Sequence, residues 1–240
     1  MERLDKLLSS RGAGSRKEVQ ALIRSGAVSV NGETVRKPEI KIDIFKDEVR
    51  LGGQAVDLSE HVYIMMNKPA GVISATEDRN ERTVLDLLPE NMRRPKLFPA
   101  GRLDKDTVGL LIITDDGDFA HRMLSPGKHV EKQYRATLDR EADAEDIAAF
   151  ERGIILSDGT KCLPSKLEIP DPSRAENVLV RLCEGKYHQV KRMFASRGKK
   201  VVQLERISIG NLYLDGNLNR GEAKFLTKLD IYAIFIGNMH

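Results

Sequence analysis

The 240-residue sequence has no tryptophan, only two cysteines and no long uninterrupted run of apolar residues. The two cysteines, Cys162 and Cys183, are too few for a disulfide framework or a zinc cluster, which favours a reducing compartment. No stretch approaches the roughly 18–20 consecutive apolar residues that a membrane helix requires. The segment from Met1 to Asp5 leads straight into charged sequence, without the apolar region of a signal peptide. We therefore expect a cytoplasmic protein with no membrane segment.

The signatures of several cofactor-dependent and hydrolytic enzymes are absent as well. The sequence has no Walker A motif and no dinucleotide-binding glycine fingerprint after a predicted strand. It also lacks the G-x-S-x-G elbow of serine hydrolases. The five histidines, at positions 61, 121, 129, 188 and 240, have neither HExxH nor paired spacing. We predict that the protein holds no catalytic metal and needs no cofactor.

What is present is an ordinary globular composition with a slight excess of positive charge. The chain is 40% hydrophobic and 31% charged, and it is long enough for one large core and a small accessory domain. Its net charge of +3 is compatible with nucleic acid as a partner but does not imply one.

The first 48 residues have the pattern of a small unit with two helices and a hairpin. Leucines at i, i+3 and i+4 from Leu4 predict one short helix. Ser15 and Glu18 have the spacing of a capping box for a second helix, and Gly26 stands where that helix should end. Alternating residues up to Asn31-Gly32 then predict a β-hairpin. A unit this small buries little core, which suggests a docking module.

The polar faces of these two predicted helices are basic, and by pattern alone they could be ordinary solvated faces. The run of Ser15 to Glu18, Leu22-Ile23, Gly26, Val28 and Val30 to Gly32 resembles the RNA-binding domain first named for ribosomal protein S-four. The resemblance covers roughly residues 1–48 and implies that the basic face lies along an RNA backbone. The basic residues are Arg3, Lys6, Arg11, Arg16, Lys17 and Arg24, of which Arg16 and Lys17 are our candidate RNA contacts.

Residues 49–60, which include Gly52-Gly53, are predicted to link this module to a second domain at 61–240. Helices of the second domain are expected around 119–124, 147–150 and 190–194, with a helical turn at 83–86. Strands are expected at 62–66, 110–114, 134–138, 178–182, 201–202 and 231–236. Because the strands outnumber the helices at hairpin-like spacing, we expect an α+β fold with a mostly antiparallel sheet and packed helices. The N-terminal module is expected to be a small α/β unit.

One loop of the second domain has the character of a catalytic segment. Residues 101–110 are polar, bounded by glycines and followed directly by a strand that is expected to be buried. A carboxylate held there would be positioned rigidly, as a nucleophile or general base must be. The pattern does not choose between Asp104 and Asp106, and an ordinary charged loop is an equally good interpretation.

A second segment, 181–200, concentrates positive charge. It contains seven Lys or Arg residues and one acid, Glu184, whereas the whole chain carries a net charge of only +3. The segment is either a solvated basic helix or part of a groove for an anionic polymer.

Taken together, four segments resemble the RsuA-type small-subunit ribosomal RNA pseudouridine synthases, in order and over nearly the whole chain. The matching motifs are Asn67-Lys68-Pro69-x-Gly71, Gly101-Arg102-Leu103-Asp104-x-x-Thr107-x-Gly109-Leu110, Glu131-Lys132-x-Tyr134 and Gly185-x-Tyr187-His188-Gln189-Val190-Lys191-Arg192-Met193. The resemblance implies an enzyme that isomerises a specific uridine of small-subunit (16S) ribosomal RNA, by base flipping and without a cofactor. It also implies a monomer that acts on partly assembled small subunits.

The same resemblance suggests a role for each of several residues. Asp104 matches the essential aspartate, and Lys191 matches the basic residue that pairs with it. Tyr134 matches the tyrosine that packs on the target base and is a candidate base for the proton on carbon five. Leu204 lies where the family has an apolar residue under the uracil, and Arg102 matches an arginine that fills the gap left by the flipped nucleotide.

Three further residues of the last motif, His188, Gln189 and Arg192, are candidate substrate contacts. Two alternatives stay open at this point: a synthase for large-subunit RNA, and a non-catalytic RNA-binding assembly factor. The sequence of the motif at residues 188–192 favours the small-subunit group, and the presence of Asp104 argues against a non-catalytic protein. The resemblance leaves open whether Asp104 attacks the sugar, attacks the ring or drives elimination to a glycal.

Overall fold

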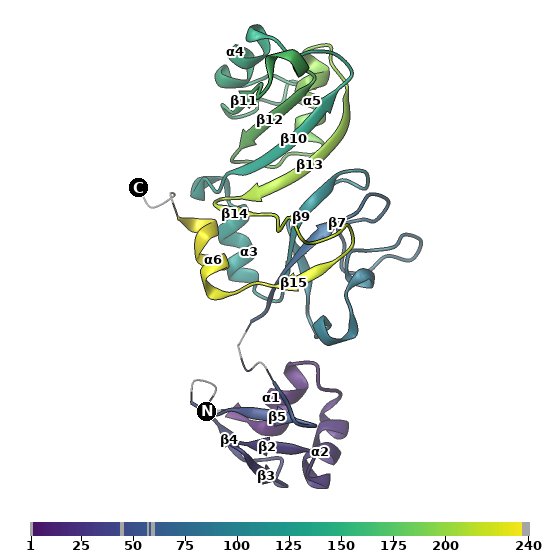
Figure 1. Ribbon diagram of the computed structural model, residues 1–240, viewed down its shortest axis with the longest axis vertical. Coiled ribbons are helices and arrows are strands. Elements are labelled where there is room, and N and C mark those ends of the chain that lie inside the picture. The colour runs from purple at the N-terminus through teal and green to yellow at the C-terminus, as the bar shows by residue number, and fades with distance from the viewer. Residues whose placement is uncertain (1, 44–45, 57, 59–60, 237–240) are drawn as a thin grey trace. The chain divides into compact units, whose positions relative to one another are not determined.

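The computed structural model describes residues 2–43, 46–56, 58 and 61–236, which fall into two compact units (Figure 1). The smaller unit comprises Met1–Val62 with Pro89–Leu97, and the larger comprises Tyr63–Leu88 with Phe98–His240. Among the described residues, no helix has both the length and the apolar character needed to cross a membrane.

The smaller unit contains two helices and short strands around one apolar core. Ser15 accepts a hydrogen bond from the backbone of Glu18, whose side chain accepts one from the Ser15 backbone, so the predicted capping box is confirmed. Gly26 ends the second helix in the left-handed conformation. The helices are α1 (Leu4–Ser10) and α2 (Arg16–Ser25), and the strands are β1 (Glu2–Arg3), β2 (Val28–Val30), β3 (Glu33–Val35), β4 (Lys41–Ile42), β5 (Val49–Leu51) and β6 (Gln54–Ala55).

The predicted hairpin is confirmed as β2 and β3, which pair across Asn31-Gly32. The sheet order is β3-β2-β5-β6, while β1 and β4 form a separate pair. The leucines of α1 and Val19 and Ile23 of α2 face one core, where all of them are buried. Residues 49–56 of the predicted linker carry β5 and β6, and residues 57, 59 and 60 lie outside the described residues.

The larger unit is built on one mixed sheet, in the order β11-β12-β10-β13-β9-β7-β15, with β14 paired to β13 and β8 to β9. Its strands are β7 (Tyr63–Lys68), β8 (Phe98–Ala100), β9 (Val108–Thr114), β10 (Lys132–Leu138), β11 (Lys166–Glu168), β12 (Asn177–Leu182), β13 (Val201–Ile209), β14 (Leu212–Tyr213) and β15 (Ala223–Phe225). Its helices are α3 (Gly117–Leu124), α4 (Ala144–Arg152), α5 (Gln189–Ser196) and α6 (Lys228–Phe235). Its short 3-10 turns lie at Leu85–Leu87, Pro126–Lys128 and Pro172–Arg174, and a further 3-10 turn at Glu90–Met92 belongs to the smaller unit.

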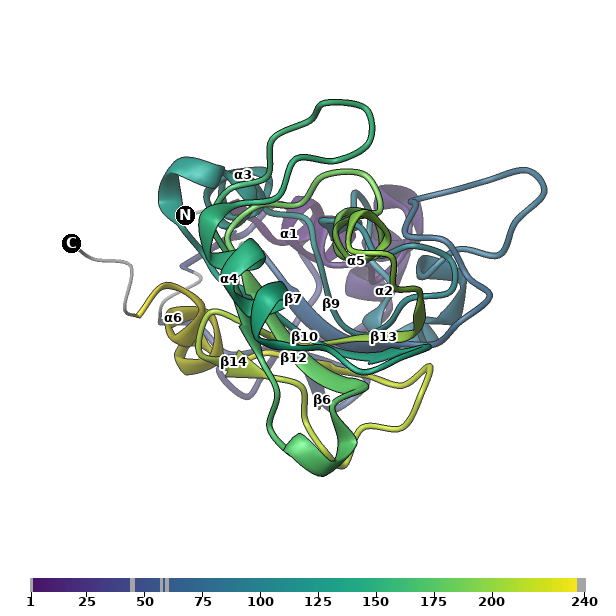
Figure 2. The same ribbon diagram turned by 90° about the horizontal axis from the view of Figure 1, so that it is seen from above.

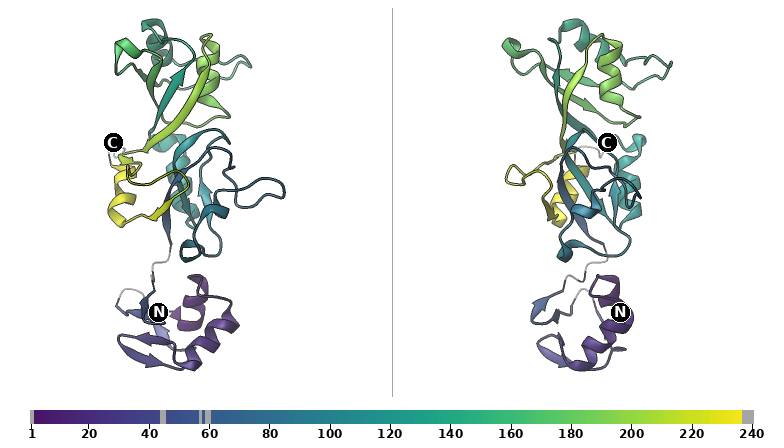
Figure 3. Two further views of the ribbon diagram at one scale, coloured as in Figure 1. Left: turned by 45° about the vertical axis from the view of Figure 1, so that its right-hand side comes forward. Right: turned by 90° about the vertical axis from the view of Figure 1, so that its right-hand side faces the viewer.

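All strand pairs of this sheet are antiparallel except β9 with β13, so the expected mostly antiparallel α+β fold is confirmed. The long β13 pairs with β10 along most of its length and with β9 at Glu205 and Arg206, and it thereby joins the two parts of the sheet (Figure 3). Helix α5 packs against β13 (Figure 2), which brings the last sequence motif onto the sheet.

The expected strand at 231–236 is wrong, because α6 occupies Lys228–Phe235. Thr227 and Asp230 form a capping box that starts this helix. The apolar run was ambiguous between strand and helix by periodicity alone. Helix α6 lies beside α3 (Figure 1), where Phe235 meets Phe119 edge to face with ring centroids 5.8 Å apart.

Candidate active site

The loop that carries Asp104 connects β8 to β9, and its backbone is hydrogen-bonded to Lys68 at the end of β7. The Lys68 ammonium donates hydrogen bonds to the carbonyl oxygens of Thr107 (2.9 Å), Asp104 (3.0 Å) and Pro69 (3.1 Å). The Lys68 side chain is fully buried, and this burial lowers its pKa to about 8. Because carbonyl dipoles replace water around the ammonium, they hold both the lysine and the loop backbone in place.

Two further contacts hold the ends of the same loop. The Ser74 hydroxyl lies 3.0 Å from both the backbone nitrogen and the carbonyl oxygen of Leu103. Gly109 has a φ of 101°, and a Cβ added there would lie 2.3 Å from the Arg206 carbonyl oxygen. Only glycine therefore allows β9 to approach β13 at this point. These contacts restrict the conformation of the loop where it joins the sheet.

The Asp104 carboxylate lies beside the N-terminal part of α5. Lys191 Nζ is 3.0 Å from Asp104 Oδ2 and 2.5 Å from Asp106 Oδ1. His188 Nε2 is 3.5 Å from Asp104 Oδ1. The Lys191 hydrogen bond lowers the pKa of Asp106. Burial opposes the charge on Lys191, but its hydrogen bonds to Asp106 and Asp104 outweigh burial and raise its pKa.

A pocket opens next to Asp104 and gathers predicted site residues from distant parts of the chain. Arg102 comes from the same loop, Tyr134 from β10 and Leu204 from β13. His188 and Gln189, at the start of α5, complete this part of the lining. Asp104 lines the pocket with a side chain that is 24% exposed, whereas Asp106, 74% exposed, is not among the lining residues, so a molecule in the pocket would meet Asp104.

Gln189 lies in the pocket wall but is only 5% exposed, and its amide is engaged with the preceding loop. Its nitrogen donates to the buried Glu184 carboxylate (2.6 Å), and its oxygen accepts from the Lys186 backbone (2.8 Å). The Glu184 carboxylate also accepts from the Leu163 backbone (2.8 Å) and pairs with the Lys186 ammonium. Gln189 therefore supports the loop at 184–188 in addition to lining the pocket.

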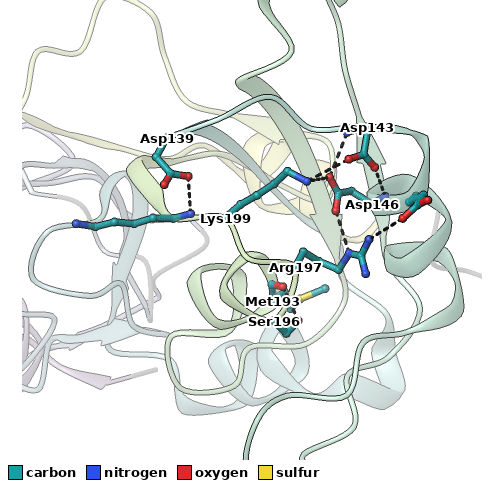
Figure 4. Close-up of polar contacts among 9 residues, drawn as sticks. Asp139, Asp143, Asp146, Met193, Ser196, Arg197 and Lys199 are labelled. Atoms are coloured by element: carbon teal, nitrogen blue, oxygen red, sulfur yellow. Dashed lines mark hydrogen bonds and ion pairs between the residues drawn. The ribbon is translucent and has the colours of Figure 1, made fainter.

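Most basic residues of the segment 181–200 are paired with carboxylates, nearly all of which lie outside the segment. Figure 4 shows Arg197 and Lys199 converging on Asp146, which is completely buried. Six of the seven basic residues form ion pairs: Arg181 with Glu168, Lys186 with Glu184, Lys191 with Asp104 and Asp106, Arg192 with Asp158, Arg197 with Glu145 and Asp146, and Lys199 with Asp143 and Asp146.

The other predicted RNA contacts, Arg192, Arg16 and Lys17, are not among the residues that line the pocket. Arg192 Nη2 is 2.5 Å from Asp158. Arg16 and Lys17 belong to the smaller unit, where Arg16 Nε is 3.1 Å from the buried Asp5 carboxylate. Lys17 is exposed at the start of α2.

Sequence reasoning missed two buried cations beside Tyr134. Arg206 lies opposite Tyr134 in the pairing of β13 with β10, and Lys132 precedes Tyr134 by two residues, so all three share one face of the sheet. Burial and the Arg206 guanidinium lower the pKa of Lys132 to about 8. Arg206 Nε donates to the Leu110 carbonyl oxygen (2.8 Å), while its Nη2 has no partner among the described residues. In the sequence, the alternation of residues along β10 and β13 could have indicated that Lys132 and Arg206 face the same side of the sheet as Tyr134.

Comparisons with known proteins identify the family to which the chain is similar. The family model described as RNA pseudouridylate synthase matches residues 62–196, and the S4 domain matches residues 2–49. An uncharacterised RNA pseudouridine synthase, YtzG of Bacillus subtilis, is 46% identical over 97% of this chain and 98% of its own length. The ribosomal small subunit pseudouridine synthase A of Vibrio cholerae is 41% identical over 97% of this chain and 99% of its own length.

A solved structure extends the agreement to three dimensions. A crystal structure of a pseudouridylate synthase, 38% identical in sequence, superposes with a TM-score of 0.68 and covers 98% of this chain and 100% of that one. The sequence-based family prediction is confirmed. The chain therefore belongs to the RNA pseudouridylate synthase family and is an enzyme that isomerises uridine in RNA.

Proposed function

We propose that this enzyme converts one specific uridine of small-subunit ribosomal RNA to pseudouridine, with Asp104 as the catalytic carboxylate. The observation that carries the proposal is the Asp104 carboxylate itself, held at the pocket by a fixed loop and paired with Lys191. The choice of RNA is supported by relatives from Vibrio cholerae and Escherichia coli that are named for the small ribosomal subunit.

The chemistry suits a lone carboxylate. The bond between N1 of uracil and C1′ of ribose breaks, the uracil turns, and a bond forms between C5 and C1′. The C5 proton is then removed and N1, which carried the ribose and no proton, takes up a proton, so substrate and product are isomers. Asp104 can act by adding to the sugar, by adding to the ring or by removing a ribose proton, and each route requires it as an oriented anion.

The target uridine must leave its stack to reach Asp104, at a cost of a few kcal/mol. Tyr134 and Leu204 both line the pocket and offer a ring and an apolar side chain on which an extruded uracil can pack. Tyr134 is also our candidate for accepting the C5 proton. Arg102, at the rim of the same loop, is proposed to fill the space that the flipped nucleotide leaves. Lys191 keeps the Asp104 carboxylate in one orientation throughout.

The proposal includes a preference for RNA that is not yet fully assembled, because a finished subunit can bury the target uridine. The test is to map pseudouridines in ribosomal RNA from cells with and without the gene, and after complementation with Asp104→Asn. We expect one small-subunit site to disappear, to return with the wild-type gene and to stay absent with the variant. Loss confined to large-subunit RNA would refute the small-subunit assignment, and equal turnover on mature subunits would refute the assembly preference.

A further inference from the structure

Tyr187 is a large aromatic side chain that the fold leaves open beside the pocket. It is 75% exposed, although Lys186 before it and His188 after it both line the pocket. The Tyr187 ring stacks on the His188 ring, with centroids 3.8 Å apart and planes 18° from parallel. One face of the tyrosine is therefore covered by the histidine, and the rest of the ring is open to solvent.

The loop that carries this aromatic pair is well anchored. Gln189 bonds both to the Lys186 backbone (2.8 Å) and to the buried Glu184 (2.6 Å), which fixes the loop from below. Arg192 donates to the Tyr187 carbonyl oxygen (3.4 Å). His188 adopts the left-handed conformation, with a φ of 48°, at the N-terminus of α5. The exposed ring thus projects from a backbone held in one conformation, which limits the entropy that it would lose on binding a partner.

The position of the pair relative to the catalytic carboxylate suggests what that partner is. His188 Nε2 is 3.5 Å from Asp104 Oδ1, and the Tyr187 ring stacks on the same imidazole, so His188 links the tyrosine to the proposed reacting centre. Tyr187 itself is not among the residues that line the pocket, so a flat group stacked on its open face would lie outside the pocket. It would still be close enough to belong to the same RNA strand as a uridine held there.

We propose that Tyr187, supported by His188, is a stacking platform for a nucleobase adjacent to the target uridine. The proposal rests on the function proposed above and adds a second base-binding site to it. When the uridine flips out, the bases on either side lose a stacking partner, and an open aromatic ring can replace it. Stacking of this kind tolerates any base, because every base has a π-face.

The test compares tyrosine variants on RNAs that lack one base. The probe is a stem-loop RNA centred on the uridine identified by mapping, with either its 5′ or its 3′ neighbour made abasic. Both kcat/KM and the RNA dissociation constant are measured for wild type, Tyr187→Ala and Tyr187→Phe. Tyr213→Ala is the matched control, since Tyr213 is also an exposed tyrosine (58%) but lies on β14.

On the intact RNA, we expect Tyr187→Ala to weaken binding between about fivefold and about 150-fold, as for one lost base–aromatic stack. Tyr187→Phe should restore most of that loss, because the ring is retained. On one of the two abasic RNAs, wild type and Tyr187→Ala should bind alike. A tyrosine that merely supports His188 would give the same loss on all three RNAs, and this result, or full affinity in Tyr187→Ala, would overturn the proposal. Wild-type enzyme that binds the RNA but forms no pseudouridine would instead refute the proposed function.

Discussion

Two aspartates of the same loop, Asp104 and Asp106, receive different surroundings from the fold. Both accept from Lys191, but Asp104 lines the pocket and is mostly shielded, whereas Asp106 is 74% exposed. The loop pattern placed both in one polar segment and did not choose between them, whereas the resemblance to the family favoured Asp104. Spacing along a chain does not reveal which side of a loop meets a cavity, so the pattern alone left this choice open.

Asp104→Asn tests the catalytic assignment while keeping the shape of the side chain. We expect turnover to fall by at least about a thousandfold, because the amide can act neither as nucleophile nor as base. RNA affinity and melting temperature should stay close to wild type, since binding comes mainly from other contacts. Asp106→Asn is the control and should keep most of the activity. An inactive Asp106→Asn alongside an active Asp104→Asn would show that the other carboxylate is catalytic.

Lys191→Met tests whether the ion pair orients Asp104. The ammonium is 3.0 Å from Asp104 Oδ2, and its loss removes this contact while the His188 contact at 3.5 Å remains. We expect kcat to fall about 10- to 100-fold, the scale expected for a misplaced catalytic group, with little change in KM. Single-turnover kinetics with saturating enzyme separate the two effects. A weaker RNA affinity at unchanged kcat would make Lys191 a phosphate contact instead.

At the scale of elements, the ion cluster around Asp146 ties α4 to the far end of α5 (Figure 4). The completely buried Asp146 carboxylate accepts from Arg197 Nε (2.9 Å) and Lys199 Nζ (2.5 Å), while Asp143 caps α4. A buried carboxylate with two cationic partners is costly to remove, because Arg197 and Lys199 then keep only the longer contacts to the exposed Glu145 and Asp143 carboxylates (3.6 and 3.3 Å). The cluster therefore fixes where α5 ends and β13 begins.

Asp146→Ala should accordingly lower the free energy of unfolding by about 3–5 kcal/mol. Glu145→Gln is the neighbouring control: its side chain is 89% exposed and lies 3.6 Å from the same Arg197, so we expect a change within about 1 kcal/mol. Urea denaturation of both full-length variants measures the difference. Equal stability of Asp146→Ala and wild type would show that the cluster does not stabilise the fold.

The ion cluster around Asp146 is also an example of what could not be predicted from the sequence. Periodicity located most strands and helices, because the apolar faces of β10, β12 and α5 follow their own local period. The same reasoning misassigned α6, whose capping signal at Thr227 was overlooked. It also counted charge locally in the segment 181–200, whereas the partners of Arg197 and Lys199 lie about 50 residues earlier. Pairing over that distance is decided by tertiary structure.

At the scale of the whole molecule, the catalytic unit is accompanied by a unit with its own core and its own exposed basic residues. Several basic side chains of the small unit are already paired, such as Arg3 and Arg16 with Asp5 and Lys6 with Glu2. Lys17 and Arg24, by contrast, are exposed on α2. They are seven residues apart, which is about two helical turns, so they share one face.

We therefore expect Lys17 and Arg24 to bind RNA phosphates, and the salt dependence of RNA affinity to report it. Each phosphate contact adds about 0.7–0.9 to the slope of log affinity against log salt, so the double variant Lys17→Gln/Arg24→Gln should flatten that slope by about 1.4–1.8. Arg50→Gln is the control, because its guanidinium is already 2.7 Å from Glu48. Binding titrations at several salt concentrations, made in the Asp104→Asn background to prevent turnover, measure the slopes. An unchanged slope in the double variant would place the phosphate contacts elsewhere. If the slope is flattened, and the same double variant with Asp104 intact still modifies the same uridine, then this unit contributes affinity and the pocket selects the base.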